Sequence, residues 1–289
     1  QDVDDFLFSS QHKRLIVHMP TGAGKTRTSM EAICDYLRLN TKTNPVIVWL
    51  AHSSELCEQA VESFERQWGK VGSKSCQVIR WWGGTKIPEL SADTPIFVVF
   101  SFGSAYESLV SNNKDKFTSA LKIKSRCGLL VVDEAHQAIA PTYQASIEVL
   151  SNQDTKIIGL TATPGRHAIG QSDDSTKELA SFFENNKISI KGDDGGVLED
   201  PIKYLTELEV LSKVSRHPLN INSDFTVSEK EKVYMSRYLE LPSELLERLG
   251  QDANRTNMIA VNVMHLVLDE DRKTIVFAPS KDNSVELAS

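Results

Sequence analysis

Residues 19–28 of the chain read MPTGAGKTRT and directly follow an apolar run. Gly22 and Gly24 would let the backbone curl closely around a bound phosphate, and a helix that begins after them directs its positive end at the same point. Lys25 can then reach the outer phosphates, and the Thr26 hydroxyl is a ligand for Mg²⁺. The pattern therefore predicts a phosphate-binding loop between a strand and a helix. The residues expected to hold the nucleotide are Thr21, Gly22, Ala23, Gly24, Lys25 and Thr26.

One position departs from the usual spacing of such loops. The pattern G-x-x-x-x-G-K-[ST] has a glycine where this chain has Met19. On this stretch alone, a glycine-rich turn that enters a helix with a solvated lysine stays an alternative.

A second stretch, LLVVDEAH at residues 129–136, places two carboxylates at the end of an apolar run. Carboxylates there are costly to bury unless they have a function. Asp133 can hold magnesium, and Glu134 is then placed to orient and deprotonate a water that attacks the γ-phosphate. The alternative is an acidic strand end that caps the next helix.

The spacing of apolar runs indicates how these two stretches meet. Short runs rich in Val and Ile alternate with polar, helix-compatible segments, which predicts an α/β fold with a parallel sheet between helices. The runs are at 15–17, 46–50, 78–79, 96–100, 129–132 and 157–160. Ligands bind at the carboxyl ends of such strands. Lys25, Asp133 and Glu134 are therefore expected to face one nucleoside triphosphate, which the chain hydrolyses.

The remainder of the chain has a different pattern. Residues 226–271 look helical, with a capping box at 226–229 and a break at Pro242. Residues 273–280 look like a buried strand, and 282–288 look like the start of a helix. The sequence thus has the pattern of a piece of a longer protein that stops soon after a second α/β unit begins.

Composition narrows the class of protein. The 289 residues are 40% hydrophobic and 25% charged, with a net charge of -7. No run approaches the length of a membrane span, and the start lacks the basic residues of a secretory signal. The four cysteines form no C-x-x-C pair, which argues against a zinc site or disulfide framework and fits a reducing cytoplasm. The acidic balance counts mildly against a nucleic-acid partner, although a local groove can still be basic.

These motifs, in this order, resemble superfamily 2 helicases and translocases with a D-E-A-H box. The matching stretches are PTGAGKT (20–26), VWLAHSSELCEQ (48–59), VVFSFGSA (98–105), VVDEAH (131–136), GLTATPGR (159–166) and TIVFAPS (274–280). That superfamily commonly lacks the first glycine of the loop, which accounts for Met19. The resemblance implies a RecA-like P-loop NTPase domain at 1–212, a mostly helical linker or insertion at 213–272, and the beginning of a second RecA-like domain at 273–289.

The resemblance also implies residue roles. Gln1 falls about where the family's adenine-reading glutamine lies. Thr161 and Thr163 would couple the ATP site to the nucleic-acid face, and His136 would connect the acidic pair to them. The nucleic-acid-binding residues would be His52, Ser53, Ser54 and Ser101. Ser53 and Ser54 are equally well placed as helix N-caps, and Trp81-Trp82 suit a core better than base stacking.

The stretches ELASFF (178–183) and YLTELEVLS (204–212) are similar to the restriction-enzyme-like branch, which includes type I and type III restriction motors and UvrB-like proteins. This implies an ATP- and Mg²⁺-dependent DNA helicase or double-stranded DNA translocase in restriction, phage defence or repair. Its partners would be double-stranded or branched DNA and a nuclease or defence-complex subunit, with no membrane. The family's arginine finger lies in the second domain, so the isolated chain is expected to bind ATP and hydrolyse it slowly.

Three alternatives remain at this point. One is an RNA helicase. Another is an ATP-gated scaffold that binds nucleic acid in a defence or repair complex while a nuclease does the chemistry. A third is a P-loop signalling NTPase, which a GTPase-type N-K-x-D motif would favour, but the sequence contains no such motif.

Overall fold

The computed structural model describes residues 2–40, 43–84, 88–110, 113–162, 174–192, 195–220, 225–238 and 241–288. These divide into two compact units, of which the first takes in the sheet and its helices up to Lys213 and the second begins at Val214.

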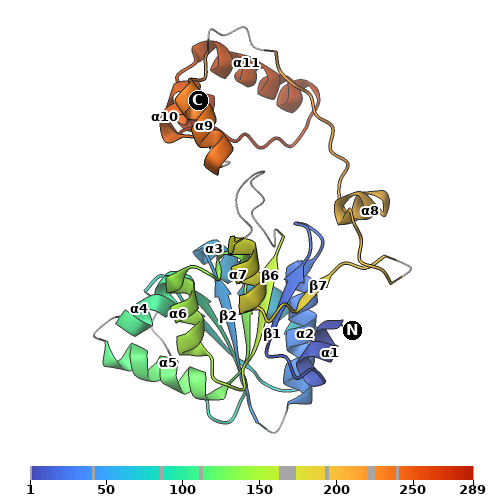
Figure 1. Ribbon diagram of the computed structural model, residues 1–289, viewed down its shortest axis with the longest axis vertical. Helices are drawn as coiled ribbons and strands as arrows, with labels where there is room; N and C mark the ends of the chain where they lie inside the picture. The colour runs from blue at the N-terminus through green and yellow to red at the C-terminus, as the bar shows by residue number, and fades with distance from the viewer. Residues whose placement is uncertain are drawn as a thin grey trace. The chain divides into compact units, whose positions relative to one another are not determined.

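The first unit is built on a twisted sheet between helices (Figure 1). The sheet is parallel, and its seven strands lie in the order β3-β4-β2-β5-β6-β1-β7. The strands are β1 (Arg14–His18), β2 (Val46–Ala51), β3 (Gln77–Trp81), β4 (Ile96–Ser101), β5 (Cys127–Val132), β6 (Lys156–Thr161) and β7 (Lys187–Ser189). The six predicted strands are confirmed, and β7 is an addition that pairs with β1 at the sheet edge. This is the predicted α/β, RecA-like arrangement.

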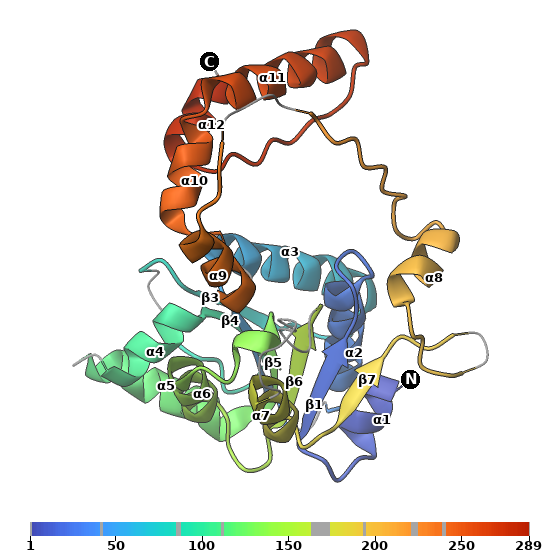
Figure 2. The same ribbon diagram turned by 45° about the horizontal axis from the view of Figure 1, so that its top comes forward.

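Helices cover both faces of the sheet (Figure 2). One face packs against α1 (Asp2–Phe8), α2 (Lys25–Leu39) and α3 (Ser54–Val71). The other packs against α4 (Phe102–Val110), α5 (Lys114–Arg126), α6 (Pro141–Leu150) and α7 (Asp174–Phe182). Each face has its own hydrophobic cluster because successive strand residues point to opposite sides. A further helix, α8 (Pro201–Glu207), follows β7.

The central strands are unbroken apolar runs because both of their faces are covered. All six residues of β2 are buried. On the face covered by α3, the Phe64 ring lies on Phe97 with centroids 4.1 Å apart, and on the other face Trp81 lies on Phe100 at 4.6 Å. Both Trp81 and Trp82 belong to the core, at 3% and 9% exposure. The prediction that this tryptophan pair packs inside the protein is confirmed.

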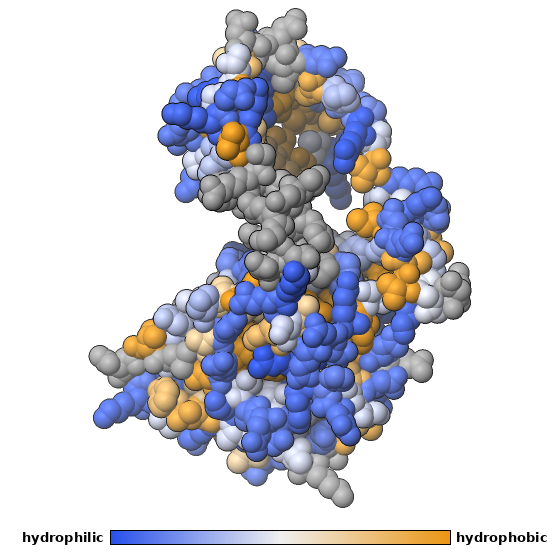
Figure 3. All heavy atoms as spheres, viewed as in Figure 1, coloured by the Kyte–Doolittle hydropathy of each residue, from blue (hydrophilic) through white to orange (hydrophobic). Residues whose placement is uncertain are grey.

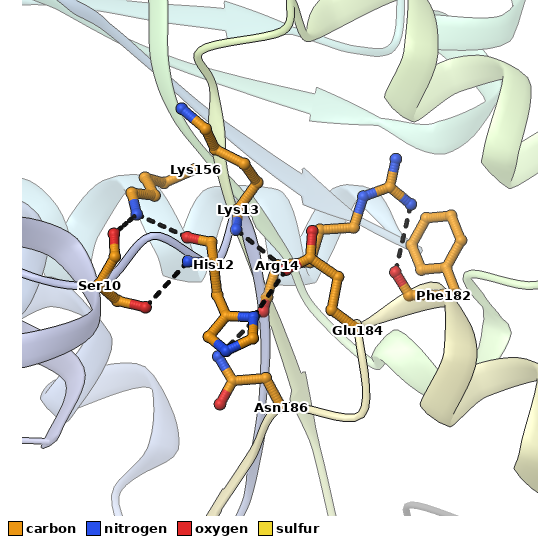
Figure 4. A network of polar contacts seen from close by, with 8 residues as sticks. All are labelled: Ser10, His12, Lys13, Arg14, Lys156, Phe182, Glu184 and Asn186. Atoms are coloured by element: carbon orange, nitrogen blue, oxygen red, sulfur yellow. Dashed lines mark hydrogen bonds and ion pairs between the residues drawn. The ribbon is translucent and has the colours of Figure 1, made fainter.

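A polar network fixes the amino end of β1, the strand that leads into the phosphate loop (Figure 4). Lys156 of β6 donates hydrogen bonds to the carbonyl oxygens of Ser10 and His12, at 2.7 and 2.6 Å. The Glu184 carboxylate accepts from the backbone N–H of Lys13 at 3.1 Å and lies 3.2 Å from the His12 ring. These contacts tie the segment that leads into β1 to β6 and to the turn that precedes β7.

The second unit is helical. It contains α9 (Glu229–Tyr238), α10 (Ser243–Gly250), α11 (Ala253–Met264), a π-helical turn (His265–Asp269) and α12 (Lys281–Ala288). The buried side chain of Asn283 in α12 donates to the Gly250 carbonyl at 3.1 Å and to Thr256 Oγ1 at 2.8 Å. The expected helical character and the break at Pro242 are confirmed.

The capping box lies two residues later than predicted. Ser228, and not Thr226, is the capping residue: its Oγ accepts from the backbone N–H of Glu231 at 3.3 Å, and the Glu231 carboxylate accepts from the Ser228 backbone N–H at 2.7 Å. Both Thr226 and Ser228 fit the sequence pattern. The glutamate three residues after Ser228 completes the reciprocal pair.

The predicted buried strand over 273–280 was wrong. The backbone there is irregular, and the side chains of Ile275 and Phe277 are 82% and 90% exposed. A strand needs a neighbour to satisfy its backbone N–H and C=O groups. The described residues of the second unit form no strand that could be such a neighbour. Apolar composition alone therefore did not produce the strand.

The surface of the first unit is mainly polar. Figure 3 shows a mostly hydrophilic face over the sheet-bearing unit, with apolar residues interspersed. No helix in the described part of the chain is long and apolar enough to cross a bilayer. All four cysteines are free, and Cys34, Cys57 and Cys127 are buried.

Candidate active site

The phosphate loop connects β1 to α2 at the carboxyl edge of the sheet. Gly22 and Gly24 have φ angles of 81° and 92°, in the left-handed region that glycine tolerates best. Gly24 is also the N-cap of α2. The N-terminus of this helix, with its unpaired N–H groups, therefore ends at the loop. The predicted strand–loop–helix unit is confirmed.

Lys25, the first residue of α2, folds back over this loop. Its Nζ donates to the carbonyl oxygens of Met19 and Pro20, at 3.0 and 3.3 Å. Burial lowers the pKa of Lys25, while the negative charges of Glu134 and Asp133 oppose that shift. The lysine is thus within electrostatic reach of the acidic pair.

The acidic pair lies where β5 ends. The backbone N–H of Asp133 donates to the Leu50 carbonyl at 2.9 Å, and the Asp133 carboxylate accepts from the N–H of Glu134 at 3.0 Å. Burial raises the pKa of Asp133, while the hydrogen bond from the Glu134 N–H lowers it; the charge of Glu134 adds a smaller rise, and Lys25 lowers it. Glu134 has a φ of 51°, an uncommon conformation for a residue with a side chain and one found often at functional sites.

A cavity of about 640 Å³ brings the two motifs together. From the loop it is lined by Thr21, Gly22, Gly24, Lys25 and Thr26, and from the end of β5 by Asp133 and Glu134. Its volume is within the range of about 300–1,000 Å³ that small-molecule sites occupy. Six of the residues expected to bind nucleotide or metal therefore share one site with Glu134, the residue expected to activate water, as the parallel sheet predicts. Ala23 lies in the same loop, where its N–H donates to the Pro20 carbonyl at 3.1 Å.

The donor set at this site suits magnesium. Thr26 offers a hydroxyl oxygen and Asp133 a carboxylate oxygen in the same cavity, and Mg²⁺ prefers such ligands together with water and substrate phosphates. Among the described residues, no group of three or more His, Cys, Asp or Glu side chains could hold a metal without a substrate.

His136 connects the acidic pair to β6. Its Nδ1 lies 3.3 Å from Glu134 Oε2 and 3.5 Å from Thr161 Oγ1, at the end of β6. The side chain of Thr161 is fully buried. The contact predicted between His136 and Thr161 is present, whereas Thr163 and also Gln1 lie outside the described residues.

The residues expected to face nucleic acid follow β2 and β4 at the same edge of the sheet. Ser53 caps α3, accepting from the N–H of Leu56 at 3.3 Å, and Ser54 is the first residue of that helix. The His52 ring is 2.8 Å from the Tyr143 hydroxyl, and Ser101 donates to Ser104 Oγ at 3.0 Å. Capping, which was left open for Ser53, is thus observed. Contact with nucleic acid stays a prediction.

Two further residues shape the site, although the sequence analysis gave neither of them a role. Leu211 lies over the phosphate loop, because a Cβ on Gly22 would come 3.1 Å from its Cδ2. In β6, a Cβ on Gly159 would come 2.7 Å from Cβ of Ala135, the residue between Glu134 and His136. Glycine inside a strand is a signal for such a close approach. Nothing in the sequence indicates the position of Leu211.

Comparison with known proteins identifies the family. Residues 2–166 match the family model described as type III restriction enzyme, res subunit. This chain belongs to that family. The match confirms the predicted restriction-enzyme-like branch of superfamily 2. It also shows that the res-subunit region contains the phosphate loop, the acidic pair and β6.

Two solved structures are reported as similar to parts of this chain. The Pyrococcus furiosus Hef helicase domain aligns with 99% of this chain and 50% of its own, at 15% identity and a TM-score of 0.49. S. cerevisiae Dbp5 bound to RNA and ADP BeF3 aligns with 66% of this chain and 44% of its own, at 17% identity and a TM-score of 0.47. The chain thus spans about half the length of these structures. No curated protein matches it.

Proposed function

We propose that this res-subunit family member hydrolyses ATP with Mg²⁺ and couples that hydrolysis to nucleic-acid binding, as a helicase or translocase motor. The observation that carries the proposal is the shared cavity of Lys25, Asp133 and Glu134. These residues come from two strand ends far apart in the sequence. A phosphate loop, a basic side chain and paired carboxylates around one cavity are the parts that phosphoryl transfer to water requires.

Each residue then has a defined task. Lys25 and the N-terminus of α2 stabilise negative charge on the phosphates. Thr26 and Asp133 would hold Mg²⁺, which supplies further charge neutralisation when bound. Glu134 holds the attacking water and accepts its proton. His136 orients the Glu134 carboxylate, which is 3.3 Å away.

We further propose double-stranded or branched DNA as the nucleic acid. Membership of the type III restriction family supports this choice. His52, Ser53, Ser54 and Ser101 lie after strand ends at the edge that carries the cavity, and hydroxyls and backbone amides there can bind phosphates without reading sequence. Thr161 and Thr163 would couple nucleotide binding in the cavity to nucleic-acid binding at the neighbouring loops. A nuclease or defence-complex subunit is the expected protein partner, and the free cysteines favour a cytoplasmic location.

The test is ATP hydrolysis by this chain and by the full-length protein with single-stranded, duplex and forked DNA and with RNA, at matched salt. The proposal predicts slow hydrolysis by the isolated chain. In the full-length protein, it predicts that duplex or forked DNA stimulates hydrolysis. Stimulation by RNA alone would indicate an RNA helicase instead. Nucleic-acid binding that depends on ATP, without stimulated turnover, would favour the scaffold.

A further inference from the structure

The cavity has a second wall, which no sequence motif assigns to the nucleotide. One face of α3 contributes Ser63, Arg66, Gln67 and Lys70 to the same lining as the phosphate loop and the acidic pair. Spacings of three and four residues place side chains on one side of a helix. We refer to these four residues as the α3 wall.

The two basic residues of the α3 wall are exposed and unengaged. Among the described residues, neither Arg66 nor Lys70 has a hydrogen-bond or ion-pair partner. Arg27, the other exposed arginine in the lining, lies 3.4 Å from Glu31. Arg66 and Lys70 therefore offer the cavity positive charge that no ion pair among the described residues engages.

Two of the acidic residues of the same helix are engaged away from the cavity. Glu58 and Glu65 of α3 lie 2.9 and 3.5 Å from Arg80 on β3. Their carboxylates are thus directed toward a partner elsewhere. Glu62 lines the smaller lobe described below, so the cavity side of α3 carries the two cations Arg66 and Lys70 and one carboxylate.

A smaller lobe of about 290 Å³ places Arg66 near the proposed metal ligands. Thr26, Asp133, Ser63 and Arg66 line both this lobe and the larger cavity. The lobe also reaches the indole of Trp49, whose buried Nε1–H lacks a hydrogen-bond acceptor among the described residues. A buried donor without a partner is rare in folded proteins and marks a place where an oxygen atom can be bound.

A triphosphate bound in this cavity and the two carboxylates together carry more negative charge than Lys25 alone can balance. Lys25 is close to both Asp133 and Glu134, whose charges oppose the lowering of its pKa. A triphosphate that enters this cavity must approach the same two carboxylates, and like charges at short range repel strongly where water is partly excluded. A guanidinium group binds phosphate oxygens in pairs, and an ammonium group acts as a point charge.

We propose that Arg66 and Lys70 bind the polyphosphate chain of the nucleotide from α3, with Arg66 on the metal-proximal side. This inference rests on the proposed ATP site. Affinity should therefore depend on these residues more strongly for Mg-ATP than for Mg-ADP, and not at all for adenosine.

The experiment measures equilibrium binding of Mg-ATP, Mg-ADP and adenosine by calorimetry to wild type, Arg66→Ala, Lys70→Ala and the double variant. Arg38→Ala is the matched control, because Arg38 is an exposed arginine on neighbouring α2 that pairs with Asp35 at 3.0 Å and lines neither lobe. The Kd of Mg-ATP should rise about tenfold in each single variant, the loss expected for one charge-assisted hydrogen bond to phosphate. Adenosine binding and the Arg38→Ala control should not change.

Salt titration adds a readout that a merely structural effect would not produce. Mg-ATP affinity of the double variant should fall less steeply with ionic strength than that of wild type. Arg66→Lys should recover part of the loss, because it keeps the charge without the fork.

The outcomes separate this inference from the proposed function. If wild type binds Mg-ATP through Lys25 and the double variant binds it equally tightly, the α3 wall has no role with nucleotide. Binding of duplex DNA is measured on the same variants: if the double variant loses affinity for DNA and keeps its affinity for Mg-ATP, the cations serve nucleic acid and the inference is wrong. If wild type binds no Mg-ATP, the proposed function fails together with the inference.

Discussion

The imidazole Nδ1 of His136 lies 3.3 Å from a carboxylate oxygen of Glu134. The same nitrogen is 3.5 Å from the buried hydroxyl of Thr161 on the neighbouring strand. Glu134 itself has a left-handed backbone, so its side chain leaves the strand end at an unusual angle. The histidine therefore holds the carboxylate proposed to activate water, and it also contacts the strand proposed to sense nucleic acid.

Replacing His136 should lower turnover without weakening nucleotide binding. His136→Ala frees the Glu134 carboxylate. The His136 side chain does not itself line the cavity, so its loss should leave the nucleotide contacts in place. We expect kcat to fall by about tenfold or more, since a mispositioned base loses part of the 10²–10⁴ that such groups contribute. The Kd of Mg-ATP should not change. Gln137→Ala, at the next position, is the control, and an unaltered kcat in His136→Ala would exclude the orienting role.

Asp133 should reduce the stability of the nucleotide-free protein at neutral pH. Burial raises its pKa from 3.8 and outweighs the hydrogen bond from the Glu134 N–H and the charge of Lys25, so the folded state holds the carboxyl proton more tightly than the unfolded state. The destabilisation is absent below the unfolded pKa, where both states are protonated, and grows as pH rises through the folded pKa. Asp133→Asn should therefore have a higher unfolding temperature than wild type at pH 7, with an advantage that shrinks toward pH 3.8.

Exposed Asp93→Asn serves as the control for loss of one negative charge. Equal unfolding temperatures for wild type and Asp133→Asn at neutral pH would mean that the carboxylate is not destabilised by its surroundings. Thermal unfolding followed by circular dichroism across the pH series makes the comparison.

The two glycine substitutions Gly22→Ala and Gly69→Ala should have opposite effects. Gly22 has a φ of 81° and a Cβ there would come 3.1 Å from Leu211, whereas a Cβ on helical Gly69 meets no atom within 4 Å. Gly22→Ala should cost about 1–3 kcal/mol through backbone strain and weaken Mg-ATP binding. Gly69→Ala should stabilise by about 0.5–1 kcal/mol. Urea unfolding measures both, and a neutral Gly22→Ala would show that the loop tolerates a side chain.

Gly159 should be intolerant of a methyl group. A Cβ there would come 2.4 Å from Phe183 Cζ and 2.7 Å from Ala135 Cβ. We expect Gly159→Ala to destabilise by about 1–3 kcal/mol through overpacking and to lower kcat by displacing the turn that holds Glu134. Adding Phe183→Leu should restore only part of the stability, because Ala135 remains. Full recovery of both stability and kcat would show that only the Phe183 contact matters.

The principal strands and the meeting of the two motifs followed from the sequence. Apolar runs such as 46–50 and 96–100 are long and rich in Val and Ile, and parallel strands bring their carboxyl ends to one edge. Lys25 and Asp133 could therefore be placed together without coordinates. Strand β7 could not, because Lys187–Ser189 has one apolar residue and forms only by pairing with β1.

Other features depend on tertiary packing that local patterns do not encode. Leu211 lies over the phosphate loop, and one side of α3 lines the cavity, because segments far apart in the sequence pack against each other there. In the segment 273–280 the apolar pattern is that of a strand, yet Phe277 is 90% exposed, and none of the described residues forms a strand beside it. The apolar composition of that segment favours a β-strand, but a strand forms only when a neighbouring strand pairs with it.

The most direct test of the central claim is Mg-ATP binding and turnover by wild type, Lys25→Ala and Glu134→Gln under the same conditions. We predict that Lys25→Ala loses binding, and that Glu134→Gln binds Mg-ATP as tightly as wild type but does not hydrolyse it. Wild-type turnover in Glu134→Gln, or unchanged Mg-ATP affinity in Lys25→Ala, would contradict a single nucleotide site shared by the phosphate loop and the acidic pair.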